Sequence, residues 1–196
     1  MTSRVTFVSP AMNRSVREAR FDDGSPLDAG GAARARSAAG TLSAADRVLV
    51  SPTVRCRETA SALGLVAVEA PELGGMDMGR WRGRTLGEVS AEEPDQVAHW
   101  LADPAAALHG GESVRALCER VGRWLEATAQ TDGRTLVVVE PEIVRATVVR
   151  VLAAHEATFW RLDVPPLTAT EISGRSGRWN LRLGQTLGAR EPEGGH

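Results

Sequence analysis

Three apolar segments of this sequence end in a polar residue that is followed directly by proline. The three endings are Ser9-Pro10, Ser51-Pro52 and Glu140-Pro141. A carboxylate at the end of a central strand can act as a general acid or base, so Glu140 is the first candidate catalytic residue; the alternative is a carboxylate that is solvated or paired with an arginine. The Ser9 hydroxyl can donate to a substrate carbonyl, or it can bond its own backbone in a Ser-Pro turn.

The elements that would position these residues form an alternating pattern. Apolar, β-branched runs at 4–10, 46–52 and 134–141 predict buried parallel strands, and helical patterns occupy 26–42, 53–65, 111–129 and 142–154. Segments 167–173 and 178–184 predict a closing hairpin. The sequence therefore predicts an α/β fold, a three-layer α/β/α sandwich with a mostly parallel central sheet. Ligands of such sheets bind at the carboxyl ends of the strands. We expect one domain over residues 1–185 and a disordered tail over 186–196.

Composition narrows the classes of partner. The chain has 196 residues and a net charge of −2, which gives no basic surface for nucleic acid. No apolar run is long enough to cross a membrane, and the N-terminus lacks a signal-peptide pattern. Two isolated cysteines indicate reduced thiols, so we expect a cytoplasmic protein. We expect a small-molecule ligand, no nucleic-acid or membrane partner, no metal and no cofactor. A homodimer is compatible with the sequence.

Four segments carry a resemblance to a known family. They are "SPTVRCRETASALGL" at 51–65, "LGGMDMGRWRGRTLGEV" at 73–89, "HGGESVRALCERVGRWLEA" at 109–127 and "LVVVEPEIVRATVVRVL" at 136–152. In order and spacing they resemble the histidine phosphatase superfamily, the phosphoglycerate-mutase-like fold. The segment from 159 to 182 is similar to the end of actinobacterial members. The resemblance covers residues 4 to 185 and implies a histidine-phosphatase-like fold.

The family's chemistry requires residues that this chain does not have at the matching positions. The resemblance places Ser9 at the motif arginine, Pro10 at the nucleophilic histidine, Gly75 at the acid and Glu140 at the second histidine; Arg55 alone matches. Proline has no nucleophilic atom, so a phosphohistidine cannot form at position 10. The sequence therefore predicts a divergent member that lacks both catalytic histidines.

Charge then predicts the type of ligand. The cleft implied by the resemblance gains Glu140, with Glu142 and Asp77 nearby, and a carboxylate about 4 Å from a phosphate costs about 4 kcal/mol at an effective dielectric constant near 20. We therefore expect a neutral or cationic metabolite. One hypothesis is metal-free acid/base chemistry (isomerisation, dehydration, cyclisation or hydrolysis), in which Glu140 moves protons and Arg55 stabilises negative charge. The alternative is an inactive pseudophosphatase that binds a ligand or a protein.

Further candidate substrate-binding residues come from the same segments: Ser9, Asp77, His109, Glu112, Glu142 and Trp81. For His109 the hypothesis is a loop imidazole that overhangs the cleft. Glu112 either faces the cleft or belongs to an ordinary helix start. Trp81 either lines an apolar pocket with Trp100 or packs in the core, as most tryptophans do.

Overall fold

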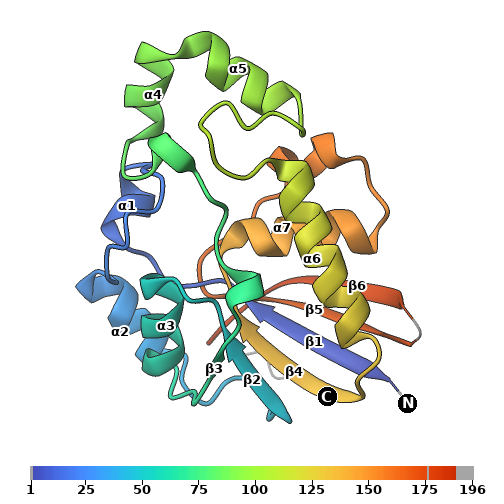
Figure 1. Ribbon diagram of the computed structural model, residues 1–196. Coiled ribbons are helices and arrows are strands. Elements are labelled where there is room, and N and C mark those ends of the chain that lie inside the picture. Colours follow the sequence, from blue (N-terminus) through green and yellow to red (C-terminus); the bar gives the residue numbers. More distant parts are fainter. Residues whose placement is uncertain (1, 176, 189–196) are drawn as a thin grey trace, which may run out of the picture.

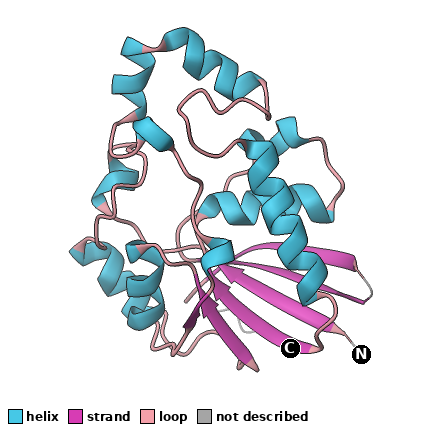
Figure 2. Cartoon of the chain, viewed as in Figure 1, coloured by secondary structure: helices cyan, strands magenta, loops and turns pink. Residues whose placement is uncertain are grey.

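The computed structural model describes residues 2–175 and 177–188 (Figure 1). Helices and strands alternate through most of the chain (Figure 2). In chain order the elements are β1 (Ser3–Val8), α1 (Arg14–Arg17), α2 (Ala29–Ser37), β2 (Arg47–Val50), α3 (Val54–Ala62), β3 (Val68–Glu69), η1 (Pro71–Leu73), η2 (Gly79–Trp81), α4 (Leu86–Glu92), α5 (Pro94–Ala102), α6 (Val114–Thr128), β4 (Gly133–Val138), α7 (Pro141–Val151), η3 (Glu156–Arg161), β5 (Thr168–Arg175) and β6 (Arg178–Thr186).

The sheet has the strand order β3-β2-β4-β1-β5-β6. β1 and β2 both pair in parallel with β4, and β2 pairs in parallel with β3. β5 runs antiparallel to β1, and β6 runs antiparallel to β5. The predicted α/β fold with a mostly parallel sheet and a closing hairpin is thereby confirmed. Because β1, β2 and β4 are parallel and adjacent, their carboxyl ends meet at one edge of the sheet.

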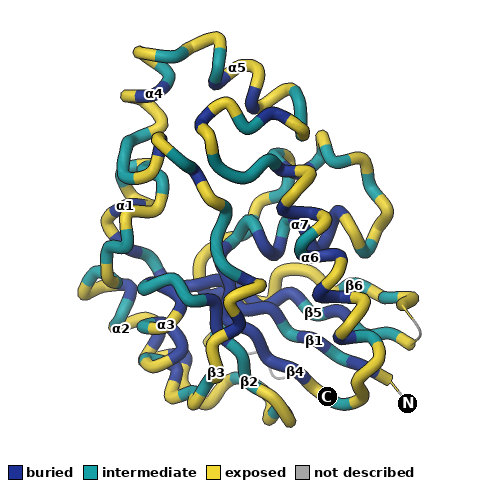
Figure 3. Tube along the Cα trace, in the orientation of Figure 1, coloured by how far each residue is buried: buried dark blue, intermediate teal, exposed yellow. Residues whose placement is uncertain are grey.

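Helices cover both faces of the sheet, which explains the nearly continuous apolar runs. In β4, Val137 packs with α6 and α7 on one face, whereas Leu136 and Val138 pack with α3 and with Ala38, which directly follows α2, on the other. The central strands accordingly lie in the most buried part of the molecule (Figure 3). The expectation of full burial is wrong for β2, where only Val50 is buried. The two-residue edge strand β3 beside it is too short to cover the rest.

The helices flanking the cleft begin at predictable caps. Thr53 caps α3 by accepting from Cys56 N–H, and Ser113 caps α6 by accepting from Ala116 N–H at 3.1 Å. α7 begins at Pro141, a residue suited to the first helical turn, directly after Glu140. α6 has 15 residues and is the longest described helix; none of the described helices is long and apolar enough to cross a membrane.

A helical arm formed by α4 and α5 extends away from the sheet (Figure 1). It has a small core of its own, which consists of Met78, Trp81, Val89, Val97 and Trp100. The Phe21 ring stacks on Trp81 with 5.8 Å between centroids, and Trp100 packs on Trp160 at 4.4 Å. These aromatic contacts hold the arm over the carboxyl edge of the sheet.

The predicted tail lies largely beyond the described residues. Thr186 ends β6, and Leu187 N–H donates to the Leu167 carbonyl at 2.9 Å. Residues 189–196 lie outside the described residues, so the expected disorder of that segment stays a prediction.

Candidate functional site

A cavity of about 340 Å³ lies between the carboxyl ends of the parallel strands and the helical arm. We call it the cleft. Its polar floor comes from the starts of α3 and α7, and its apolar wall comes from the arm, the loop before it and η3. The lining residues are Pro10, Asn13, Ser15, Val16, Arg20, Phe21, Asp22, Arg55, Met76, Met78, Trp100, Glu140, Pro141, Glu142, Arg145, Trp160, Val164 and Pro166.

A buried ion pair forms the floor of the cleft. Arg55 and Glu140 are 8% and 3% exposed, and Arg55 Nη2 donates to Glu140 Oε2. Glu140 Oε1 also accepts from the Thr53 hydroxyl at 2.8 Å and from Arg55 Nε at 3.4 Å. The two residues lie 85 positions apart in the sequence and meet because β2 and β4 are parallel neighbours. The structure thus shows the pairing with an arginine that was the alternative to a catalytic role for Glu140, and the catalytic role stays a prediction.

The ion pair controls the charges around it. Burial by itself lowers the pKa of Arg55, but the charge and hydrogen bonds of Glu140 outweigh burial and raise it above its usual value. Arg55 is therefore permanently charged. The Cys56 thiol lies 3.6 Å from Glu140 Oε1, and burial, followed by the nearby negative charge, raises its pKa well above the usual value. Cys56 is consequently a poor nucleophile.

Glu142 is the second carboxyl group of the cleft. It lies in the first turn of α7, is half-buried, and its Oε1 accepts from Met76 N–H at 3.1 Å. Burial and the negative charge of Glu140 raise its pKa above the usual value. Gly75 lies against both carboxyl groups: a Cβ atom at this position would be 3.2 Å from Glu142 Oε1 and 3.5 Å from Glu140 Cγ.

Pro10 lines the cleft, but Ser9 does not. Ser9 is fully buried; its hydroxyl lies 2.5 Å from the Pro165 carbonyl, to which it donates, and it accepts from Thr168 N–H at 3.0 Å. These bonds tie the end of β1 to the start of β5. Neither expectation for Ser9 holds: its hydroxyl is turned away from the cleft, and it bonds the distant segment at 165–168 rather than the backbone of its own turn.

Asp77 and Glu112 lie outside the cleft lining, where two loops cross. Asp77 Oδ1 accepts from Gly79 N–H, and its carbonyl accepts from Glu112 N–H at 2.7 Å. Glu112 forms an ion pair with Arg120 at 2.7 Å. Both carboxylates are thus occupied in holding the loops that carry the arm.

His109 and Trp81 are also absent from the cleft lining and instead form the core of the arm. Trp81 is fully buried, and its ring centroid lies 5.0 Å from that of His109. His109 is 1% exposed, its Nδ1 accepts from Gly111 N–H at 3.1 Å, and burial lowers its pKa. The expectation that this imidazole overhangs the cleft is wrong, because the ring is enclosed by tryptophans.

Sequence reasoning missed much of the cleft wall. Phe21, Met76, Met78, Trp160 and Arg145 line it. Arg145 Nε donates to the Leu162 carbonyl at 2.8 Å, and its guanidinium lies 5.9 Å from the Phe159 ring centre. The sequence offered one indication for Arg145: it lies one helical turn after Glu142 on α7, and residues at this spacing share a face of the helix. The methionines and aromatic residues gave none, since such residues usually pack in cores.

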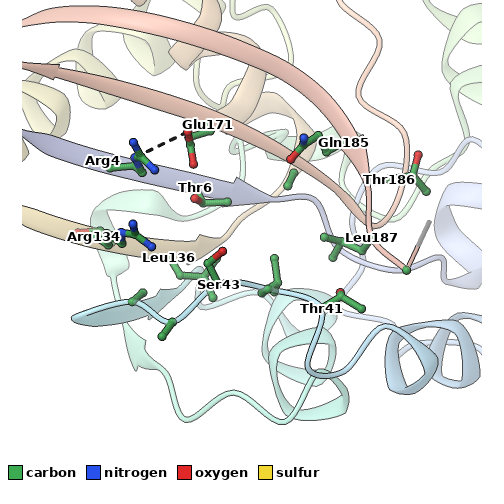
Figure 4. Close-up of a pocket in the computed structure, with 16 residues that line it drawn as sticks. Arg4, Thr6, Thr41, Ser43, Arg134, Leu136, Glu171, Gln185, Thr186 and Leu187 are labelled. Carbon is green, nitrogen blue, oxygen red and sulfur yellow. Dashed lines mark ion pairs between the residues drawn. The ribbon is translucent and has the colours of Figure 1, made fainter. Parts of the chain in front are cut away.

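A second cavity, of about 450 Å³, lies over the middle of the strands rather than at their ends (Figure 4). Arg4 and Glu171 form a loose ion pair in it, with 3.8 Å between Arg4 Nε and Glu171 Oε1. Its charged groups are partly exposed and form no buried ion pair like that of the cleft, so we place the candidate functional site at the cleft. Within the described ranges no cluster of three or more His, Cys, Asp or Glu residues could hold a metal ion.

The fold and the position of the cleft define an α/β protein whose candidate site lies at the carboxyl edge of a mostly parallel sheet. A family model, "Histidine phosphatase superfamily (branch 1)", matches residues 10–186. The chain therefore belongs to the histidine phosphatase superfamily. A comparison with curated proteins finds no match.

Several solved structures have the same fold. A mycobacterial glucosyl-3-phosphoglycerate phosphatase, solved with VO3, is 22% identical, with 92% of this chain and 97% of that chain covered and a TM-score of 0.81. The α-ribazole phosphatase from Shigella flexneri is 21% identical, with 96% and 100% covered and a TM-score of 0.81. A phosphoserine phosphatase from Entamoeba histolytica is 14% identical, with 93% and 96% covered and a TM-score of 0.83. These similarities establish the fold.

Proposed function

We propose that this chain is a member of the superfamily that lacks both catalytic histidines and does not transfer phosphoryl groups. It carries out metal-free acid/base chemistry on a small neutral or cationic metabolite bound in the cleft. The observation that carries the proposal is the buried Arg55–Glu140 pair beside Pro10. Position 10 supplies no nucleophile, and the arginine that could hold a phosphate already holds a carboxylate.

Electrostatics supports the exclusion of phosphate. An incoming phosphate dianion would have to displace Glu140 from Arg55 or lie beside the carboxylate in a partly enclosed cavity. At about 4 Å and an effective dielectric constant near 20, each pair of like unit charges costs about 4 kcal/mol. A neutral or cationic ligand meets no such penalty.

The cleft wall supports an organic ligand with substantial apolar surface. Phe21, Met76, Met78, Trp100 and Trp160 form one side of a cavity whose other side is polar. Cavities of about 300 Å³ and more with mostly apolar walls and a few convergent polar groups are typical small-molecule sites. Such a ligand would place its polar end at the carboxyl groups and its apolar body against the aromatic rings.

The reaction types compatible with this arrangement are isomerisation, dehydration, cyclisation and hydrolysis. Each needs a proton delivered to or removed from the substrate, and a carboxyl group at the cleft floor can do either. The guanidinium of Arg55 stabilises negative charge that develops nearby. Such chemistry suits a cytoplasmic enzyme of specialised metabolism whose partner is a small molecule.

A second candidate function is a pseudophosphatase that binds a ligand or protein without chemistry. The hydrogen bonds of Glu140 favour it, because both of its oxygens already accept from Thr53 or Arg55 and leave little of the carboxylate free to act on a substrate. The two candidates share the cleft and differ in whether turnover occurs.

The first experiment tests phosphatase activity with 4-nitrophenyl phosphate. We expect no hydrolysis above background; hydrolysis that disappears in Arg55→Ala would overturn the proposal. The second experiment screens neutral and cationic metabolites for turnover with the wild type, Glu140→Gln and Glu126→Gln, the last being an exposed α6 carboxyl as the matched control. Turnover that is lost in Glu140→Gln but kept in the wild type and in Glu126→Gln supports the proposal of an enzyme. Metabolites that bind all three proteins equally and are converted by none of them would favour the pseudophosphatase.

A further inference from the structure

We propose that Glu142 carries the transferable proton of the cleft, and that Glu140 is a positioning residue that holds Arg55. This assignment rests on the proposed function for its catalytic meaning, but the location of the proton can be tested without any substrate. It differs from the sequence-based hypothesis, in which Glu140 itself moves protons.

The hydrogen bonds of Glu140 leave it little freedom. Its Oε1 accepts from Thr53 Oγ1 and Arg55 Nε, and its Oε2 is paired with Arg55 Nη2. Moving either oxygen toward a ligand would weaken a buried ion pair, and losing one partner of such a pair is costly. Glu140 is therefore suited to holding Arg55 in place.

Glu142 has the opposite environment. Among the described residues no arginine forms an ion pair with it, and its Oε1 accepts a hydrogen bond from Met76 N–H. Since Oε1 is occupied as an acceptor, the acid proton belongs on Oε2. The side chain lines the cleft and is only half-buried, so a ligand can reach it.

The charged groups around the cleft favour a protonated Glu142. Burial raises the pKa of Glu142, and Glu140, on the same loop-to-helix junction, is a like charge that raises it further. The backbone N–H bonds to Glu142, including that from Met76, and the charge of Arg55, on α3, offset this only in part. The other charged lining residues have partners of their own. Arg20 is bonded to Glu18 and to the Gly83 carbonyl, Arg145 to the Leu162 carbonyl, and Asp22 lies 3.9 Å from Arg82.

Gly75 provides the space that this arrangement needs. A Cβ atom at position 75 would lie 3.2 Å from Glu142 Oε1 and 3.5 Å from both Glu140 Cγ and Thr53 Cγ2. A longer side chain, in particular a third carboxylate, would be forced against the other two. The glycine at position 75 thus leaves room for the Glu142 carboxyl group at the cleft floor.

The proton transfer balances within the cleft. Glu142 Oε2 gives its proton to an oxygen or nitrogen of the ligand, whose lone pair forms the new O–H or N–H bond. The carboxylate that remains lies within the field of Arg55. It is protonated again by the proton that the ligand releases later in the reaction, or by a hydronium ion of the solvent. The ligand is therefore a molecule with a hydrogen-bond-accepting group at its polar end, such as a carbonyl, hydroxyl or amine.

The test is a titration of carboxyl ¹³C signals by NMR in the unliganded protein, using the wild type, Glu142→Gln and Glu126→Gln. We expect one glutamate signal to titrate above the usual range in the wild type and in Glu126→Gln, and to be missing in Glu142→Gln. In Glu140→Gln the same signal should move down by about one pH unit or more, because a like charge has been removed.

The titration separates this assignment from the proposed function. A Glu142 signal at or below the usual range, or a high-titrating signal that disappears in Glu140→Gln and persists in Glu142→Gln, would overturn the assignment whatever the activity. With a converted metabolite in hand, Glu142→Gln should lower kcat about 10²-fold or more. The wild-type rate should fall as the pH rises through the measured Glu142 pKa. A pH profile unchanged in Glu142→Gln would contradict the catalytic role.

Discussion

Replacing Arg55 by methionine should destabilise the protein strongly, because it leaves a buried carboxylate without its counter-charge. Arg55 and Glu140 are 8% and 3% exposed. Removing one partner of such a buried pair costs about 3–5 kcal/mol. The neighbouring Thr53 and Cys56 groups still donate to Glu140, so we expect the lower half of that range.

The loss of stability can be converted into an expected change in Tm. For a chain of this size, about 1 kcal/mol shifts Tm by about 2–4 °C, so a loss of about 3–4 kcal/mol in Arg55→Met should lower Tm by roughly 6–16 °C. The double variant Arg55→Met/Glu140→Leu should recover most of the loss, because replacing a whole buried ion pair with apolar side chains is often neutral or stabilising.

The assay is urea and thermal unfolding of the two single variants and the double variant, combined into a double-mutant cycle. The matched control is Arg57→Met, on the same helix: Arg57 pairs with Glu69 at 3.2 Å, and both side chains are 49% exposed. This exposed pair should be worth less than about 1 kcal/mol. If Arg55→Met costs no more than Arg57→Met, the buried-charge reasoning is refuted.

Three further predictions concern titratable groups. The pKa of Glu142 is raised above its usual 4.5, so the folded state binds this proton more tightly; stability should fall as the pH rises above about 4.5, and Glu142→Gln should flatten that slope in urea unfolding. Burial lowers the pKa of His109 below 6.5, so the free energy of unfolding should decrease as the pH falls below about 6.5. A His109→Gln variant should not show this decrease; if its dependence of stability on pH equals that of the wild type, the prediction is wrong. Burial raises the pKa of Cys118 to about 11 and that of Cys56 well above its usual value. Iodoacetamide should therefore label neither thiol until the protein is unfolded, and rapid labelling of the native protein would contradict this.

The parts of the fold that the sequence predicted are those with strong local patterns. β1 and β4 were predictable because an apolar run buried on two faces has few alternatives. α6 was predictable because its apolar residues repeat at helical spacing after a Ser113 cap. α4 and α5 were not assigned. Their stability comes largely from an aromatic cluster to which Phe21 and Trp160 contribute from distant parts of the chain.

Some residues of the candidate site could be placed from the sequence and others could not. Arg55 and Glu140 could be brought together in advance, because the carboxyl ends of parallel strands meet at one edge. His109, Asp77 and Glu112 could not be placed, since the orientation of a loop side chain depends on the surfaces that pack against it. The crossing of their two loops allows no Cβ at position 111, where it would lie 2.0 Å from the Asp77 carbonyl oxygen.

The sequence by itself determined the class of fold, the edge of the sheet where a site lies, and the absence of a nucleophile at position 10. These follow from local periodicity and from side-chain chemistry, which need no knowledge of distant contacts. Only the tertiary structure revealed the different surroundings of the two carboxyl groups, on which their proposed roles rest. Glu140 faces an arginine and Glu142 faces a backbone N–H and the space beside Gly75. Whether a carboxyl group keeps its charge depends on burial and on neighbouring charges, and both are set by packing.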